Sequence, residues 1–131
     1  MGPMESYCDK HHAASHGYSS STIWQQHEDY IRPQENGSHY DCDYVQLDGA
    51  GIKLTAVGAK PFCFNASHYT QEELTEKEHD YELHPCDSTV LCLDYAQNGI
   101  GSASCGPRLA EQYRLDDASF DFSIRLIPEK A

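Results

Sequence analysis

The sequence has little positive charge, no long apolar run and no paired-cysteine motif. Nine Lys and Arg stand against 21 Asp and Glu, which gives a formal net charge of −12. Because this surplus repels phosphate groups, we expect no nucleic-acid partner and no membrane partner. No apolar stretch approaches the roughly 20 residues of a membrane-spanning helix. The first ten residues also lack the apolar region of a signal peptide, so we expect a cytoplasmic protein.

Motifs that define several large protein classes are absent as well. Without a Cys-x-x-Cys pair, the sequence supports neither a zinc ribbon nor a thioredoxin-like redox site. It contains no Rossmann, P-loop, HExxH, GxSxG or EF-hand pattern. The six cysteines have no secretory context, so we interpret them as reduced thiols rather than as a disulfide framework.

The length fits one domain with an irregular opening segment. The chain has 131 residues, of which 39% are apolar, and we expect a single domain over residues 1–131. Residues 1–39 are polar, rich in Ser and His, and have no regular hydrophobic period. We interpret them as a loop-rich opening segment with one short strand around Thr22–Gln26. A loop of this length indicates a functional role, or packing against another part of a larger protein.

After residue 39 the pattern changes to short alternating segments, which predict strands. Residues 40–47 alternate apolar and polar side chains, and residues 52–57 form a second run. The Asp48-Gly49 pair is typical of a tight turn, so we expect a β-hairpin here. Residues 62–64 predict a short third strand. The apolar face predicted for the first strand carries Tyr40, Cys42 and Tyr44.

The second half predicts one helix and further strands. Thr70–Glu73 forms a capping box, in which the Thr hydroxyl accepts from the third helical amide, so a short surface helix should cover residues 71–77. Residues 81–84 and 89–95 predict a second hairpin. Residues 118–126 alternate with a period of two and predict the last strand. The sequence therefore predicts a mainly β fold, an antiparallel β-sandwich with one short helix.

Two groups of polar side chains have a chemical and a simpler interpretation. The first group could bind a transition metal, but no partner pair lies at zinc-finger spacing, so a polar loop is favoured and we expect no metal site. This group contains Cys8, Asp9, His11, His12 and His16. The second group consists of the carboxyl pairs Asp41/Asp43 and Asp116/Asp117. Glycosidases need two convergent carboxyls, one in an apolar site, and solvated positions are the favoured interpretation here.

Trp24 and Cys105 also allow two interpretations each. Trp24 is the only Trp, and its ring could stack on a sugar or pack in the core. Cys105 lies in the Gly-rich segment 99–107, where a nucleophile would need a base or a helix N-terminus to lower its pKa. No such partner is identifiable in the sequence, so a structural or substrate-lining loop is favoured.

Four ordered segments match short motifs of one enzyme family. They are Gly2–Asp9 (G-P-x-E-x-Y-x-D), Arg32–Gly37 (P-x-E-N-G), Phe64–Leu74 (F-N-x-S-x-Y-T) and Gly99–Pro107 (G-I-G followed by C-G-P). Their order and spacing resemble the last domain, or small-chain region, of glycoside hydrolase family 2 β-galactosidases, and the likeness covers essentially the whole chain. The resemblance implies the second half of a galactose-mutarotase-like β-supersandwich.

The resemblance also implies which parts lie elsewhere. In that family the acid/base and nucleophile glutamates, and the ligands of the active-site magnesium, lie on a separate barrel. We therefore expect no catalytic residue and no cofactor in this chain, with magnesium, and sodium as a further candidate, belonging to the parent enzyme. The chain alone should be inactive. Its expected partners are the remaining domains of the parent, a galactoside at the periphery and a further copy in a homo-oligomer.

The site residues implied by the resemblance lie mainly in the late Gly-rich loop. Ser104, Cys105 and Gly106 are expected at the edge of the active site, where Cys105 replaces a Trp of other members. Trp24, Glu35 and Asn36 are secondary candidates for sugar contact. A free-standing carbohydrate-binding β-sandwich, a subunit-assembly module and a Cys/His metal protein remain as alternatives. An excised half-sandwich should also expose an apolar face that its missing partner would cover.

Overall fold

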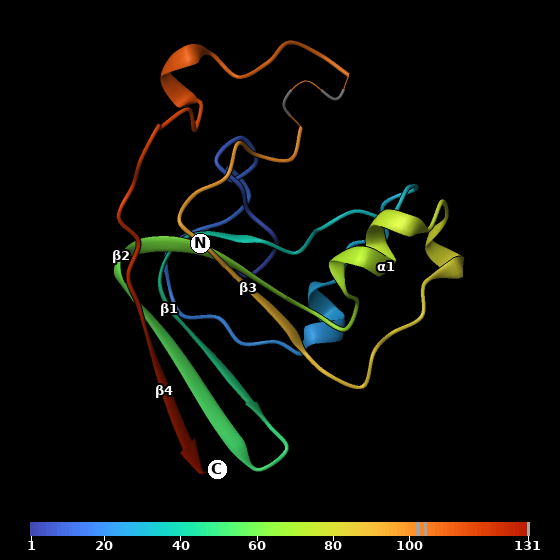
Figure 1. Cartoon of the computed structure of the whole chain (residues 1–131), viewed down its shortest axis with the longest axis vertical. Coiled ribbons are helices and arrows are strands. Elements are labelled where there is room, and N and C mark those ends of the chain that lie inside the picture. Colours follow the sequence, from blue (N-terminus) through green and yellow to red (C-terminus); the bar gives the residue numbers. More distant parts are fainter. Residues whose placement is uncertain (102, 104, 131) are drawn as a thin grey trace.

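One antiparallel sheet of four strands organises the chain. The computed structural model describes residues 1–101, 103 and 105–130. The strands are β1 (His39–Gly49), β2 (Ile52–Ser67), β3 (Val90–Asp94) and β4 (Ile124–Lys130). The long strand β2 lies in the centre, with β1 along one edge, and β4 and β3 along successive halves of the other (Figure 1). The predicted mainly β, antiparallel fold with one short helix is confirmed.

The first hairpin is confirmed, but its turn lies two residues further on than predicted. Gly49 is still paired, with Ile52, so the loop consists of Ala50 and Gly51 alone. Both residues have positive φ, 52° and 75°, as a two-residue turn of the primed type requires. The predicted strands at 52–57 and 62–64 are parts of the single strand β2.

A bulge in β1 moves Tyr44 away from the predicted apolar face. Asp41 has φ 57°, and the pairing of β1 with β2 shifts between His39 and Cys42 and again between Cys42 and Tyr44. At the first shift β1 has the extra residue, and at the second shift the extra residues are on β2. Such extra residues interrupt the regular alternation of side chains between the two faces. Tyr44 is therefore exposed, and its neighbour Val45 is buried.

The core lies on one face of the sheet. Val45, Ala56 and Phe62 are buried together, and Phe62 is 1% exposed. Five half-buried side chains complete this cluster: Leu47, Phe64, Leu91, Leu93 and Ile124. On the same face, by register, Ile52 and Leu126 remain more than half exposed. Apolar surface is thus only partly covered on this side.

The helix prediction is confirmed. Helix α1 spans Gln71–Glu76, and the Thr70 hydroxyl accepts a hydrogen bond from the Glu73 amide at 3.2 Å. Leu74 is its one buried residue, as expected for a surface helix. The described residues also form three short 3-10 turns: η1 (Ile23–Gln26), η2 (Asp80–Glu82) and η3 (Glu111–Tyr113). The strand predicted at Thr22–Gln26 is therefore wrong.

Two other strand predictions are corrected. Residues 81–84 do not pair with β3, because η2 and a loop occupy this stretch and β2 takes the edge of β3 instead. The last strand begins at Ile124 rather than at residue 118. The rings of Phe120 and Phe122 lie against Tyr95, 4.6 and 6.1 Å between centroids, and this aromatic contact holds residues 118–122 away from the sheet.

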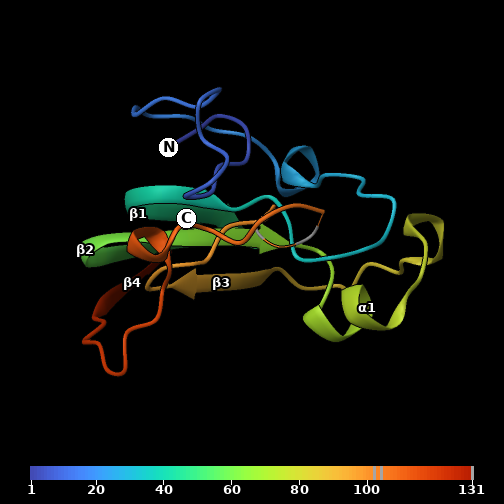
Figure 2. The same cartoon turned by 90° about the horizontal axis from the view of Figure 1, so that it is seen from above.

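The sequence predicts the loop-rich opening segment over residues 1–39, but β1 already begins at His39. Residues 1–38 contain η1 and otherwise irregular backbone, and they lie over β1 on one side of the sheet (Figure 2). Helix α1 lies beside one end of the sheet in the same view. Among the described residues, no helix has the length and apolar character needed to cross a membrane.

Candidate functional site

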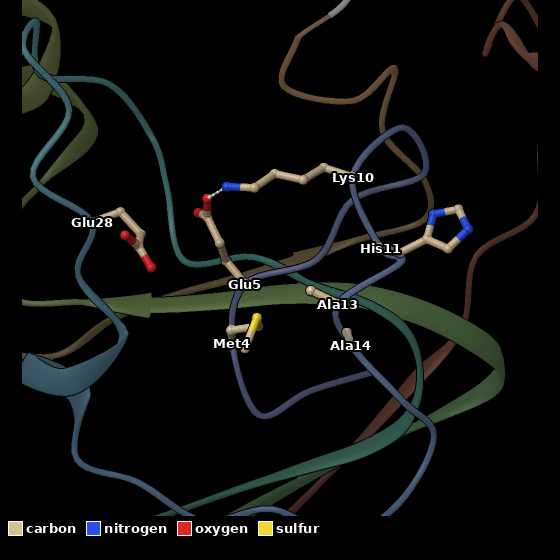
Figure 3. A pocket seen from close by; sticks show the side chains of 7 residues that line it. All are labelled: Met4, Glu5, Lys10, His11, Ala13, Ala14 and Glu28. Carbon is tan, nitrogen blue, oxygen red and sulfur yellow. Dashed lines mark hydrogen bonds and ion pairs between the residues drawn. The ribbon is translucent and has the colours of Figure 1, made fainter.

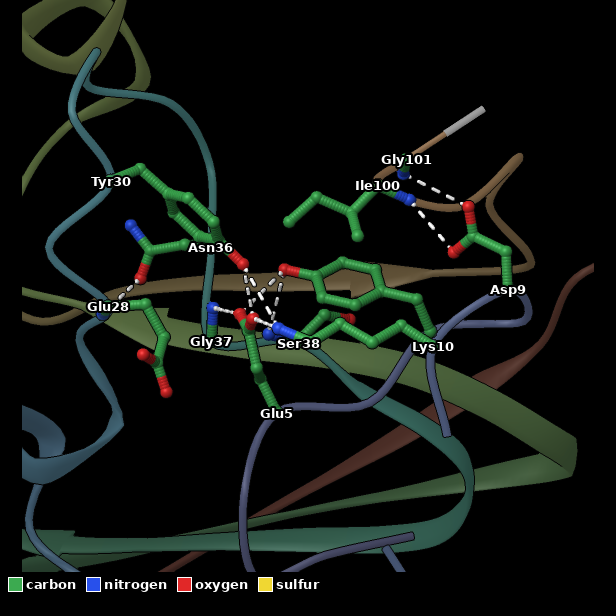
Figure 4. A network of polar contacts seen from close by, with 11 residues as sticks. Glu5, Asp9, Lys10, Glu28, Tyr30, Asn36, Gly37, Ser38, Ile100 and Gly101 are labelled. Atoms are coloured by element: carbon green, nitrogen blue, oxygen red, sulfur yellow. Dashed lines mark hydrogen bonds and ion pairs between the residues drawn. The ribbon is translucent and has the colours of Figure 1, made fainter. Parts of the chain in front are cut away.

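Buried Glu5 connects the first two motif segments. Its carboxylate accepts hydrogen bonds from Lys10 Nζ and the Tyr30 hydroxyl, from the Tyr7 hydroxyl at 3.2 Å, and from the Gly37 amide at 2.9 Å (Figure 4). Burial opposes ionisation of Glu5, but these donors outweigh burial and lower the pKa of the carboxyl below its ordinary value. Glu5 is therefore a structural anion at the centre of a polar network.

Tyr7 extends the network to the start of β1. Its ring is buried, and its hydroxyl accepts from the Ser38 amide at 3.4 Å while it donates to Glu5. Burial, with the charge of Glu5 beside it, raises the pKa of Tyr7 far above the ordinary value for tyrosine. The hydroxyl is thus held in its protonated, donating form.

The P-x-E-N-G segment is held by its own side chains and by β2. The Asn36 amide accepts from the Glu28 backbone at 3.0 Å and donates to the Gln34 carbonyl at 3.0 Å. Glu35 accepts from Asn65 on β2 and from Gln71 on α1. In this structure, two of the three secondary candidates for sugar contact, Glu35 and Asn36, have hydrogen-bond partners within the chain.

Gly37 is required in this segment by backbone geometry. Its φ is 67°, and a Cβ atom would lie 2.4 Å from the Gln26 carbonyl oxygen. No other residue type tolerates both the left-handed conformation and this close approach. The glycine therefore lets the segment pass η1 and present its amide to Glu5.

The late Gly-rich loop, residues 99–107, is attached to the first motif segment by Asp9. One carboxylate oxygen accepts from the Ile100 amide at 3.0 Å and the other from the Gly101 amide at 3.0 Å (Figure 4). Cys105 and Gly106 lie further along this loop and are exposed. Ser104, the third predicted loop residue, lies outside the described residues.

A small cavity lies beside Glu5. Its volume is about 100 Å³, which is enough for a few water molecules and too small for a sugar. Figure 3 shows Lys10 and Glu5 joined at its wall, with Glu28 on the far side. The lining residues are Met4, Glu5, Lys10, His11, Ala13, Ala14 and Glu28. This cavity belongs to the polar network and offers no substrate pocket.

Trp24 lies at a separate place, on η1. Its ring is 55% exposed and lies 4.6 Å from the His68 ring and 6.1 Å from the Tyr69 ring, between centroids. The Tyr69 ring also lies 4.9 Å from His27. Trp24 thus forms an exposed aromatic surface on the opening segment, away from the loop that carries Cys105.

One group of ligand-type side chains occurs among the described residues. His27 Nε2 lies 3.4 Å from an Asp80 oxygen and 3.5 Å from an Asp29 oxygen, and the Asp29 side chain is largely exposed. The imidazole is mostly buried, and its Nδ1 has no hydrogen-bond partner in the structure. A histidine between two carboxylates is an ordinary ion-pair arrangement, and its geometry needs no metal. The cluster predicted around Cys8 is not brought together as such a group.

The cysteines are free thiols. Burial raises the pKa of Cys8, Cys42 and Cys92, and raises that of Cys63 to about 11. A raised pKa disfavours the reactive thiolate. These four cysteines are therefore packing residues.

Sequence reasoning missed Glu5 and Asp9 as organising residues. Both belong to the quoted G-P-x-E-x-Y-x-D segment, so the motif marked them. Each has a backbone partner far away along the chain, the Gly37 amide for Glu5 and the Ile100 amide for Asp9. The acidic residues of this motif were the available signal for such structural anions.

Comparisons with known proteins support the resemblance to β-galactosidases. The family model described as "Beta galactosidase small chain" matches residues 1–126. A β-galactosidase of Actinobacillus pleuropneumoniae is 52% identical over 129 residues, and one of Staphylococcus xylosus is 42% identical over 125 residues. A β-galactosidase of Kluyveromyces lactis is 36% identical over 128 residues.

The matches cover most of this chain and a small part of each relative. The match to the Actinobacillus enzyme covers 98% of this chain and 12% of that enzyme. The corresponding shares are 95% and 13% for the Staphylococcus enzyme, and 95% and 12% for the Kluyveromyces enzyme. The chain thus spans about an eighth of the length of the curated relatives it matches. On the extent of the family match, this chain belongs to the β-galactosidase small-chain family.

Proposed function

We propose that this chain is the non-catalytic C-terminal segment of a larger retaining β-galactosidase, an enzyme that hydrolyses terminal β-D-galactosides such as lactose. In this proposal the 99–107 loop forms part of the rim of the active site, beside the leaving group. The remaining domains carry the catalytic glutamates. The observation that carries the proposal is the match to the small-chain family together with the 12% to 13% share of its relatives' length.

The lowered pKa values of two carboxyl groups make these two unsuited to acid catalysis, in agreement with the proposed non-catalytic role. A retaining glycosidase uses two carboxyls about 5–5.5 Å apart, and one of them acts as an acid with a raised pKa. Hydrogen bonds from the backbone at His79 lower the pKa of Glu82, and the donors around Glu5 lower that of Glu5. Both shifts favour the ionised form, which is the opposite of what an acid catalyst needs.

The exposed end of the Gly-rich loop supports its place at a rim. Cys105 and Gly106 are exposed, while the start of the loop is fixed to Asp9. A small thiol replaces the Trp that the family resemblance places here, so the stacking surface for a leaving group is missing. We expect a wider and weaker site for glucose-type acceptors.

The half-covered face of the sheet supports contact with the remaining domains. Ile52 and Leu126 lie on the core face and are each 55% exposed. Exposed apolar side chains next to a core are typical of a surface that another element covers. In the proposed supersandwich, the missing half would pack on this face.

Magnesium does not fit the ligand-type group found in this chain. Mg²⁺ prefers six oxygen ligands in an octahedron. His27, Asp29 and Asp80 offer one nitrogen and two carboxylates, and the imidazole nitrogen already lies within ion-pair distance of both carboxylates. We assign no magnesium to this chain and derive no step from it; the ion is proposed only for the parent enzyme.

Two experiments test the proposed function. The purified 131-residue chain should show no hydrolysis of an aryl β-galactoside above background, and a catalytic rate from it would contradict the non-catalytic role. In the full-length enzyme, Cys105→Trp should tighten the binding of glucose as an acceptor, because the ring restores a stacking surface. Unchanged acceptor affinity in that variant would contradict the place of the loop.

The exposed Trp24 favours one alternative, a carbohydrate-binding module. Because Trp24 is the only Trp, titration of the chain with galactose would change its fluorescence if a sugar stacked on the ring. Trp24→Ala is the matched variant, and saturable binding that it abolishes would favour this function. Dimerisation that rises with concentration, without sugar binding, would favour the assembly module instead.

A further inference from the structure

Both carboxylate oxygens of Asp9 accept hydrogen bonds from the start of the Gly-rich loop. Each oxygen accepts from one of two successive amides, Ile100 and Gly101, at 3.0 Å (Figure 4). Hydrogen bonds from amides to a carboxylate are stronger than those to a neutral acceptor. Two such bonds to adjacent residues fix the direction of the backbone as well as its position.

The backbone that carries Asp9 is itself firmly held. Tyr7 and Lys10 exchange two backbone hydrogen bonds, of 2.9 and 3.0 Å, so Cys8 and Asp9 form the tip of a tight turn. The Tyr7 ring is buried, and the Lys10 ammonium pairs with Glu5. The turn is thus anchored in the buried network, and Asp9 projects from a fixed base.

The loop approaches Asp9 so closely that a side chain is excluded. Gly99 has φ 85°, and a Cβ atom on it would lie 2.2 Å from the Asp9 carboxyl carbon. Two neighbouring contacts support the same segment: the Cys8 thiol donates to the Gln97 carbonyl at 3.3 Å, and the Asn98 side chain accepts from the Leu115 amide at 2.7 Å. The Gln97 side chain also donates to the Asp94 carboxylate at 2.7 Å. The start of the loop is therefore fixed over several consecutive residues, and Asp9 is the charged group that holds the Ile100 and Gly101 amides.

We propose that Asp9 is a positioning residue for the acceptor site of the parent enzyme: it fixes Ile100 and Gly101, and so sets where Cys105 and Gly106 stand beside the departing or incoming sugar. This inference rests on the proposed function. Asp9 does not touch the sugar in this account. Its role is to keep the loop in one conformation, which lowers the entropy cost of binding an acceptor.

The test uses the full-length β-galactosidase with Asp9→Asn. This change keeps the shape of the side chain, but its NH₂ group faces one of the two amides, so one of the two hydrogen bonds is lost. We expect faster amide hydrogen exchange in the peptide that covers residues 98–108. We also expect the glucose concentration for half-maximal galactosyl transfer to rise roughly tenfold, the equivalent of one lost charged hydrogen bond.

If Asp9 positions the acceptor site, Asp9→Asn should impair galactosyl transfer to glucose much more than hydrolysis. A general loss of structure would impair both reactions. Hydrolysis of an aryl β-galactoside with a good leaving group should change less than about twofold, since departure of that group makes little use of the acceptor site. Asp43→Asn is the matched control, because Asp43 is an exposed aspartate on β1. It should alter neither exchange nor transfer.

Three results would overturn the inference. Unchanged exchange in Asp9→Asn would mean that Asp9 does not hold the loop. Faster exchange with unchanged glucose dependence, while Cys105→Trp still tightens glucose binding, would refute the positioning role and leave the proposed function standing. If neither variant alters glucose dependence, the proposed place of the loop fails as well.

Discussion

Replacing Glu5 with Gln keeps the volume of the side chain and removes its charge. The native carboxylate accepts from the Gly37 amide, from Lys10 and from the hydroxyls of Tyr7 and Tyr30. A Gln amide has one acceptor oxygen, so its NH₂ end meets donors and leaves one or two of them without an acceptor. Each loss costs about 1–3 kcal/mol, and the half-exposed Lys10 pair adds about 0.5 kcal/mol. We expect Glu5→Gln to lower the free energy of unfolding by about 2–6 kcal/mol.

The pH dependence of this stability loss distinguishes the missing charge of Glu5 from a general packing defect. The pKa of Glu5 is lowered from 4.5 in the folded chain, so its stabilising contribution is complete above that value and is lost as the pH falls through the folded pKa. A protonated Glu5 resembles Gln, since it has one carbonyl acceptor and one donor. The stability difference between the native chain and Glu5→Gln should therefore be largest near neutral pH and shrink in acid.

Urea unfolding of the 131-residue chain, followed by circular dichroism at several pH values, measures this difference. Glu28→Gln is the control, because Glu28 is exposed at the same cavity and its replacement removes the same charge. It should change stability by no more than about 0.5 kcal/mol. Equal unfolding midpoints for the two variants would refute the structural role of Glu5. So would a loss in Glu5→Gln that stays constant down to acid pH.

Three further predictions concern the core, the helix and the thiols. Phe62→Ala should cost about 3–5 kcal/mol by opening a cavity, whereas exposed Phe120→Ala should cost much less; similar urea midpoints would contradict the core assignment. Thr70→Ala should cost about 1 kcal/mol by removing the N-cap of α1, and Thr70→Ser should restore it, as measured by urea unfolding. Iodoacetamide should modify exposed Cys105 first and Cys63 last, because Cys63 is buried with a pKa of about 11; mass spectrometry of partly modified chain would show the order.

The sequence predicts this fold where alternation and local turn chemistry agree. The β1–β2 hairpin and the N-cap at Thr70 follow from such local signals. The prediction fails where extra residues interrupt the pairing: the register of β1 with β2 shifts on both sides of Cys42, and Tyr44 is exposed. Nothing in an alternating pattern reveals an extra residue of this kind.

Longer-range competition explains the misplaced last strand. Residues 118–122 alternate as a strand would, but Phe120 stacks on Tyr95, and β2 accepts pairing from Ile124 onwards instead. The contacts of the candidate site could not be predicted from the sequence for the same reason. The motif segments indicate which stretches matter, whereas the contact between Asp9 and Gly101 joins residues 92 positions apart and follows only from the folded chain.

The pairing of β2 with β1 and β4 has a consequence for the order in which the strands can pair during synthesis. β1 and β2 are joined by a two-residue turn, so they can pair as soon as both have been synthesised. The edge of β2 from Ile52 to Gly58 has to wait for β4, which follows more than sixty residues later. During that interval the edge offers unpaired amides and carbonyls to any other extended chain. A pause in synthesis before residue 124 would therefore prolong the exposure of this edge to strand exchange, and chaperone dependence should concentrate in this stretch of synthesis.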